Sequence, residues 1–136
     1  MFVSDVAALG VSFDIALARL VALTGNGMLT RLSADAYAVG APAGSPWMTM
    51  SCLRDLITRP DRAVLVVRWE TGDLIGEPFP VLDADLTLTP AGPGAALLRL
   101  AGVYRARTGE AGHQVATVTI GGFLSRIAET ITAAAG

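Results

Sequence analysis

Hydrophobic residues recur every three or four positions along the last segment of the chain, residues 113–135, and this spacing predicts one long amphipathic α-helix. Its apolar face consists of Ala116, Ile120, Phe123, Leu124, Ile127 and Ile131. Its polar face consists of Gln114, Ser125, Arg126 and Glu129. Gly121 and Gly122 lie in the middle, where each costs up to about 1 kcal/mol relative to alanine. The pair either makes room for a cavity or allows a close backbone approach to a sheet or to a second subunit.

The start of the chain predicts a strand followed by helices. Residues 2–9 (FVSDVAAL) favour a strand, and Ser12 can cap a helix over 13–23 by accepting from a first-turn N–H. The apolar side of that helix, from which Arg19 is expected to point away, consists of Ile15, Ala16, Leu20 and Leu23. Gly25 suits the left-handed position that follows a helix. Start and stop signals at Ser33 and Gly40 predict a second, short helix over 34–39.

The period changes to two after residue 47, which predicts β-strands. The first is expected from 48 to about 57, followed by a turn at 59–62. Residues 63–70 (AVLVVRWE) are apolar on both faces, which is typical of a strand inside a sheet. A loop is expected over 71–80 because Gly, Pro and charged residues gather there.

Two further segments alternate so that their apolar positions can share one face of a hairpin. These positions are Leu82, Ala84, Leu86 and Leu88 before the turn at 90–95, and Leu98, Leu100, Gly102 and Tyr104 after it. One register that keeps both sets together pairs Leu86 with Leu98 and Ala84 with Leu100. It also places Asp85 opposite Arg99 on the outer face, where an exposed ion pair contributes only about 0.2–1 kcal/mol. Burial of the apolar face must therefore set the register.

Composition narrows the class of protein. The 136 residues are expected to form one domain (1–136) around a single core, since 52% are hydrophobic and the mean hydropathy is +0.53. No apolar run approaches the ~18 residues of a membrane span, and an early Asp5 without a basic region is unlike a secretory signal. These features predict a cytoplasmic protein. The net charge of −2 and the scattered arginines argue against binding to nucleic acid or to anionic membranes.

Residues that could carry chemistry are few. The single cysteine, Cys52, excludes a disulfide within the chain, and with one histidine, His113, no metal site or cofactor is predicted. A Cys52–His113 pair would need a third, orienting group, so a buried small hydrophobe is the simpler interpretation of the cysteine. Asp83 and Asp85 alternate with leucines and are expected on the outer surface rather than in a catalytic pair. Arg68 and Glu70 flank Trp69 near a strand end, and neither forms a recognisable site alone. Arg105 and Arg107 could anchor an anion, but a solvated strand end is the default interpretation.

The predicted order is a strand, a helix, a short helix, at least four antiparallel strands and a long C-terminal helix. An antiparallel sheet with helices at the chain ends curls one apolar face around a helix, which predicts an α+β fold. Five stretches also match a known family: FVSD at 2–5, VVRWE at 66–70, FPVLDADLTLTPAG at 79–92, LAGVYR at 100–105 and HQVATVTIGGFLSRIAE at 113–129. On these residues the chain resembles the START-like (SRPBCC, helix-grip) superfamily, and most closely its short members of actinobacterial type. The pattern supplies about five strands, where six or seven are usual for the superfamily.

The resemblance implies a curved sheet wrapped around the C-terminal helix, with a mainly apolar cavity between them. Members bind lipids, sterols, polyketides or other hydrophobic molecules, and some are cyclases, aromatases or hydrolases. The residues expected to line such a pocket are Met50, Trp69, Leu86, Leu100, Tyr104, Ile120 and Phe123. Ordinary core packing is the competing interpretation of these residues, and also of Trp47 and Met48. A buried Tyr104 would need a partner for its hydroxyl.

Three functions follow, in this order of preference. The first is a non-enzymatic binder of a small hydrophobic ligand of lipid or polyketide-like type. The second is an interaction or structural protein with a filled core, which forms a homodimer through the outer sheet face, where Leu97 and Val103 interrupt the polar pattern. The third is a cyclase- or aromatase-type enzyme, whose available polar groups would be Tyr104, Cys52, Thr119 and His113.

Overall fold

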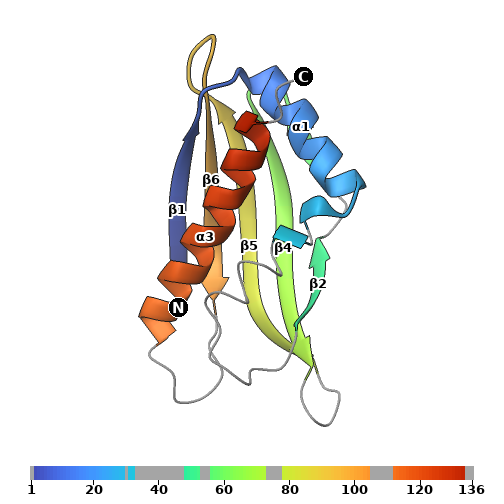
Figure 1. Ribbon diagram of the computed structural model, residues 1–136, viewed down its shortest axis with the longest axis vertical. Helices are drawn as coiled ribbons and strands as arrows, with labels where there is room; N and C mark the ends of the chain where they lie inside the picture. The colour runs from blue at the N-terminus through green and yellow to red at the C-terminus, as the bar shows by residue number, and fades with distance from the viewer. Residues whose placement is uncertain are drawn as a thin grey trace.

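An antiparallel sheet with two helices on one face makes up the described part of the computed structural model (Figure 1). The structure describes residues 2–29, 31–32, 48–52, 56–72, 78–104 and 112–133, without the side chains of 48–52, 70–72, 78–81 and 112–118. The strands are β1 (Phe2–Leu9), β2 (Met48–Cys52), β3 (Ile57–Arg59), β4 (Arg62–Gly72), β5 (Pro78–Pro90) and β6 (Ala96–Tyr104). The helices are α1 (Phe13–Gly25) and α3 (Gly112–Ala133).

The sheet carries both helices on one of its faces. The strand order is β1-β6-β5-β4-β2, and β3 also pairs with β4. Helix α3 packs against β1 and β6, while α1 packs against β5 and α3 (Figure 1). The predicted α+β arrangement, with an antiparallel sheet against a long C-terminal helix, is therefore confirmed.

The predicted count of about five strands agrees with the five-strand path β1-β6-β5-β4-β2, beside which the short β3 also pairs with β4. The strand expected from 48 to about 57 is described as β2 over its first five residues, and the separate strand β3 begins where the predicted strand was expected to end. Both pair with β4, β2 along residues 67–71 and β3 along residues 62–64. The two short strands thus follow one another along a single edge of β4, which makes β4 an interior strand as predicted.

The signals around α1 are correct at its start and wrong at its end. The hydroxyl of Ser12 accepts a hydrogen bond from the Ile15 N–H at 3.4 Å, which confirms the predicted cap. The helix continues through Gly25, and the left-handed residue after it is Gly27, with φ of 76°, not Gly25. Arg19 does not point away from the core, since it bonds to α3. The short helix predicted over 34–39 lies outside the described residues.

The loop predicted over 71–80 is shorter than expected because both neighbouring strands are longer. Strand β4 runs to Gly72 and β5 begins at Pro78. The register between them shifts between Trp69 and Glu70, so that Trp69 lies opposite Leu82 but Glu70 lies opposite Pro80. A bulge of this kind bends the sheet locally and lets the pairing continue past the irregularity.

The hairpin of β5 and β6 has a register two residues away from the predicted one. Leu86 pairs with Leu100 rather than Leu98, and Asp85 lies opposite Ala101, so the predicted ion pair with Arg99 does not form across this ladder. A shift of two keeps every side chain on its own face, so apolar burial could not distinguish the two registers. Local geometry does distinguish them. Gly92, with φ of 111°, lies in a turn that the Ala91 N–H closes by donating to the Ala95 carbonyl at 3.0 Å.

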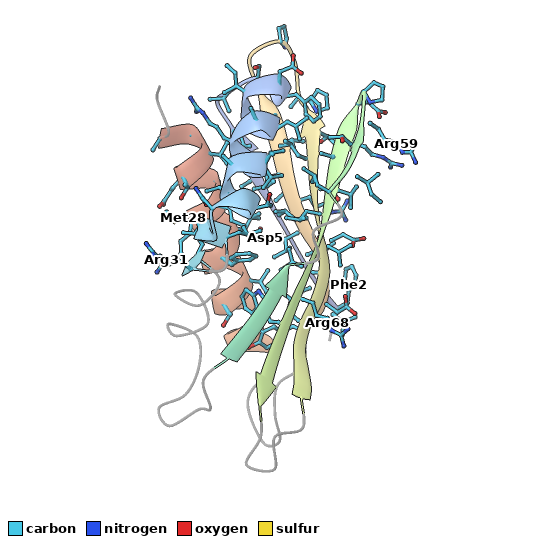
Figure 2. All side chains as sticks on the ribbon, turned by 90° about the vertical axis from the view of Figure 1, so that its right-hand side faces the viewer. Phe2, Asp5, Met28, Arg31, Arg59 and Arg68 are labelled. Atoms are coloured by element: carbon cyan, nitrogen blue, oxygen red, sulfur yellow. The ribbon has the colours of Figure 1, made fainter. Side chains whose placement is uncertain are left out.

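The outer face of the sheet is apolar at one side and charged at the other. Phe2 and Val6 of β1 and Leu97 and Val103 of β6 are exposed, with Phe2 68% and Val6 52% accessible. Phe2 pairs with Val103, Val103 with Asp83, and Asp83 with Arg68, which forms one line across the sheet. Figure 2 shows Arg59 near the upper end of the sheet and Phe2 and Arg68 well below it. The predicted exposure of Leu97, Val103, Asp83 and Asp85 is confirmed.

Candidate functional site

The inner face of the sheet is arranged in rows of side chains that run across the strands. The register gives a leucine row of Leu65, Leu86 and Leu100, which ends at Asp5. The next is a small row of Val67, Ala84, Gly102 and Val3. The last is an aromatic row of Trp69, Leu82 and Tyr104. Large side chains therefore flank a row of small ones on the face that α3 covers.

The small row includes a place where two strands approach unusually closely. A Cβ added at Gly102 would lie 2.6 Å from the Cβ of Ala84, and it would be closer still to the main chain of Asp83. Only glycine fits a separation of this kind without moving the backbone of β5. Gly102 therefore fixes both the local strand geometry and the small size of this row.

Helix α3 closes the interior with the stripe that its spacing predicted. The described members of that stripe, all buried, are Ile120, Phe123, Leu124, Ile127 and Ile131. The ring of Phe123 meets the ring of Trp69 edge to face, with centroids 5.1 Å apart and planes at 68°. Aromatic pairs in this geometry are stabilising beyond the area they bury. This contact joins α3 to β4, a strand that lies two places from β6 in the sheet.

Six of the seven predicted pocket residues have described side chains, and all six are buried together in one interior. Their accessible fractions lie between 0% and 4% for Trp69, Leu86, Leu100, Tyr104, Ile120 and Phe123. The side chain of Met50 is not described, but its backbone pairs with that of Trp69, at the end of the aromatic row. The sequence therefore predicted correctly that these six residues share one interior. Their role in binding a ligand stays a prediction.

Thr119 places a hydroxyl inside this apolar interior. Thr119 is completely buried, and within the described residues its Oγ1 atom has no hydrogen-bond partner. The sequence singled it out only as a polar group for an enzyme, not as a ligand contact. The signal that could have identified it is its spacing, since it comes four residues before Phe123 and one before Ile120, inside the apolar stripe.

The interior carries little charge. Among the described inward-facing positions of the sheet only Asp5 is charged, and it is exposed at the edge strand, where it accepts from the Val6 N–H at 2.9 Å. In the same part of the chain no three His, Cys, Asp or Glu side chains gather where they could hold a metal ion. An uncharged, partly aromatic interior suits a neutral, mainly apolar molecule.

The Gly121–Gly122 pair does not mark a close approach of α3 to the sheet backbone. A Cβ at Gly121 would meet the Oδ2 atom of Asp5 at 3.5 Å, an ordinary contact. A Cβ at Gly122 would have no described atom within 4 Å. The sheet-approach interpretation is therefore wrong, because both positions have room for a methyl group.

The remaining sequence candidates cannot be placed on this interior. Trp47, Arg105 and Arg107 lie outside the described residues, and so do the side chains of Met48, Cys52, Glu70 and His113. The thiol–imidazole pair therefore stays a prediction. Asp83 and Asp85 lie on the outer face, away from the rows. Of the described helices, none has the length and apolar character to cross a membrane.

Comparisons with known proteins show no family. No family model matches the chain, and no curated protein matches its sequence. The solved structures it is similar to include TTHA0849 from Thermus thermophilus, at 9% identity, full coverage of both chains and a TM-score of 0.44. They also include the Zhui aromatase/cyclase from a Streptomyces species, at 10% identity and a TM-score of 0.35, covering 100% of this chain and 98% of that one. Membership of the START-like superfamily therefore stays a prediction from the sequence.

Proposed function

We propose that this protein binds a small, mainly apolar molecule between α3 and the sheet, without transforming it. The observation that carries the proposal is the Trp69–Phe123 contact, with the buried hydroxyl of Thr119 one helical turn away. Sites for small molecules are mainly apolar and aromatic with a few polar groups, and this interior has that composition. The small row beneath α3 supports the same function, because it limits how much of the interior the sheet itself fills.

Calorimetric titration with naphthalene, a neutral apolar probe, tests the proposal. Ala84→Val adds two methyl groups to the small row, where Ala84 is 3% accessible. Ala8→Val makes the same change at an exposed position on the outer side of β1 and is the matched control. We expect Ala84→Val to weaken naphthalene binding by about tenfold or more, since overpacking a closed interior is unfavourable by about 1–3 kcal/mol. Equal affinity in the two variants, or no binding to the parent protein, would contradict the proposal.

An enzyme of cyclase or aromatase type ranks below a binder. Acid–base chemistry needs positioned titratable side chains within reach of the reacting group. Among the described inward-facing side chains, Thr119 and Tyr104 are hydroxyl groups, and the only carboxylate, Asp5, lies at the exposed edge. This set supports recognition of a ligand better than its transformation.

The exposed outer face favours a second candidate function, association of two copies of this chain. The apolar side of that face is formed by Phe2, Val6, Leu97 and Val103. The strand pairing places charged side chains of both signs next to it. Arg99 lies on β6, and Asp83 and Asp85 lie on β5. A twofold interface needs a surface complementary to itself, and an apolar patch with charges of both signs beside it is of this kind.

Sedimentation velocity over a range of concentrations tests this second candidate. Leu97→Asp places a charge in the apolar strip, where Leu97 is 38% accessible. Val21→Asp makes a comparable change on exposed α1 and is the control. We expect a dimer for the parent and the control, and a monomer for Leu97→Asp. A parent protein that stays monomeric at all concentrations rules out the second candidate and leaves the first unaffected.

A further inference from the structure

The hydroxyl of Thr119 is a buried polar group that the packing of the interior does not explain. The residue is 0% accessible, and the part of the chain that the structure describes offers its Oγ1 atom no hydrogen bond. Burying a hydroxyl without a partner destabilises a protein, so groups of this kind are few in folded proteins. A valine at this position would have nearly the same shape and would bury no hydroxyl.

Other helical threonines of this chain show what such a hydroxyl normally does. Thr130, on the same helix, donates to the Arg126 carbonyl four residues earlier at 2.7 Å. Thr24 donates to the Val21 carbonyl at 2.7 Å near the end of α1. This bond to the preceding turn is the usual local solution for a helical threonine. Thr119 does not make it, so its hydroxyl remains available to a group from outside the helix.

The position of Thr119 defines what that group can be. Thr119 and Phe123 are four residues apart and share one face of α3, and Phe123 contacts Trp69. A hydroxyl can donate or accept, so it can pair with either a hydroxyl or a carbonyl. Among the described inward-facing positions of the sheet no side chain is cationic, so a carboxylate would lose its solvation without a counter-charge.

Resting on the proposed function, we propose that Thr119 recognises a neutral oxygen on the ligand. The ligand class is then a mainly apolar alcohol, phenol or ketone, and not a carboxylic acid. The oxygen takes the hydrogen bond that the helix backbone does not provide, and the apolar remainder lies against the aromatic side chains.

Calorimetric titration with three probes of the same ring size tests the inference: naphthalene, 2-naphthol and 2-naphthoate. Each is titrated into the parent protein, Thr119→Val, which removes the hydroxyl, and Thr119→Ser, which keeps it. We expect the parent to prefer 2-naphthol over both other probes. Thr119→Val should lose about tenfold in affinity for 2-naphthol, the scale of one hydrogen bond, with little change for naphthalene. Thr119→Ser should retain the preference for 2-naphthol.

Thermal unfolding of the ligand-free proteins provides an independent readout. We expect Thr119→Val to melt above the parent, because it no longer buries an unpaired hydroxyl. A lower Tm for Thr119→Val would overturn the inference, since it would mean that the hydroxyl is satisfied within the protein. Equal affinity of the parent for naphthalene and 2-naphthol would overturn it too, and would leave the proposed function standing. Binding of none of the three probes would overturn both.

Discussion

The guanidinium of Arg19 donates a hydrogen bond from Nη1 to the main-chain carbonyl of Ile131 over 2.6 Å, which ties α1 to the last turns of α3. The last carbonyls of a helix have no partner within the helix, and its C-terminus favours positive charge. Helix α3 has no basic residue in its own last turn. Arg19 therefore supplies from another helix the cap that α3 lacks.

This contact predicts that Arg19 stabilises the fold. We expect Arg19→Met, which keeps most of the aliphatic stem, to lower the free energy of unfolding by about 1.5–3 kcal/mol, the range for hydrogen bonds to charged groups. Arg31→Met removes an exposed arginine and should change it by less than about 0.5 kcal/mol. Urea unfolding measures both. Similar losses in the two variants would mean that the bond between the helices contributes nothing.

The close approach at Gly102 predicts a strong dependence on glycine there. We expect Gly102→Ala to lower the free energy of unfolding by about 1–3 kcal/mol or more, because the new methyl group would overlap the main chain of β5. Gly94→Ala is the matched change in the turn before β6, where no described atom lies within 4 Å of the added Cβ. Its effect should stay within about 0.5 kcal/mol. A tolerated Gly102→Ala would show that β5 and β6 can separate at this point.

The open position at Gly122 predicts a stabilising substitution. We expect Gly122→Ala to raise the free energy of unfolding by up to about 1 kcal/mol, because alanine is the better helix former and the added methyl group has room. Gly121→Ala should also be stabilising, since its methyl group would make an ordinary contact with Asp5. Calorimetric melting measures the gain. A loss at either position would indicate that a second subunit or a ligand occupies that space.

The contact between Phe123 and Trp69 predicts a linked change in stability and fluorescence. We expect Phe123→Ala to lower the free energy of unfolding by about 3–5 kcal/mol, as for other buried aromatic side chains. In a Trp47→Phe background all tryptophan emission comes from Trp69, and the substitution should shift it to longer wavelength. Phe2→Ala, at a position 68% accessible, should change neither quantity appreciably. An unchanged Trp69 spectrum in Phe123→Ala would contradict the observed packing.

Much of the fold was predictable because amphipathic patterns determine which side of an element is buried. The stripe from Ile120 to Ile131 and the alternation of Leu82 to Leu88 each identified the correct face. The register of the hairpin was not predictable, since a shift of two residues preserves that face. It depends on the turn at Gly92 and on the contact of Gly102 with β5, and the hydrophobic pattern encodes neither of these.

The candidate site was predictable as a set of neighbours and not as a set of interactions. The hydrophobic spacing and the family resemblance together predicted that Trp69, Tyr104 and Phe123 share one interior. The unpaired state of Thr119 depends on which acceptors surround it in space, and the Arg19–Ile131 bond joins residues 112 positions apart. Contacts of this kind arise from the packing of elements, so a local pattern does not reveal them.

Native mass spectrometry of protein purified from its own host tests the central claim most directly. We expect a population carrying the added mass of one small molecule, released on denaturation, and a much smaller population in Ala84→Val. A bare chain in both proteins would contradict the account, if a crystal structure also showed the space around Trp69, Phe123 and Thr119 filled by side chains.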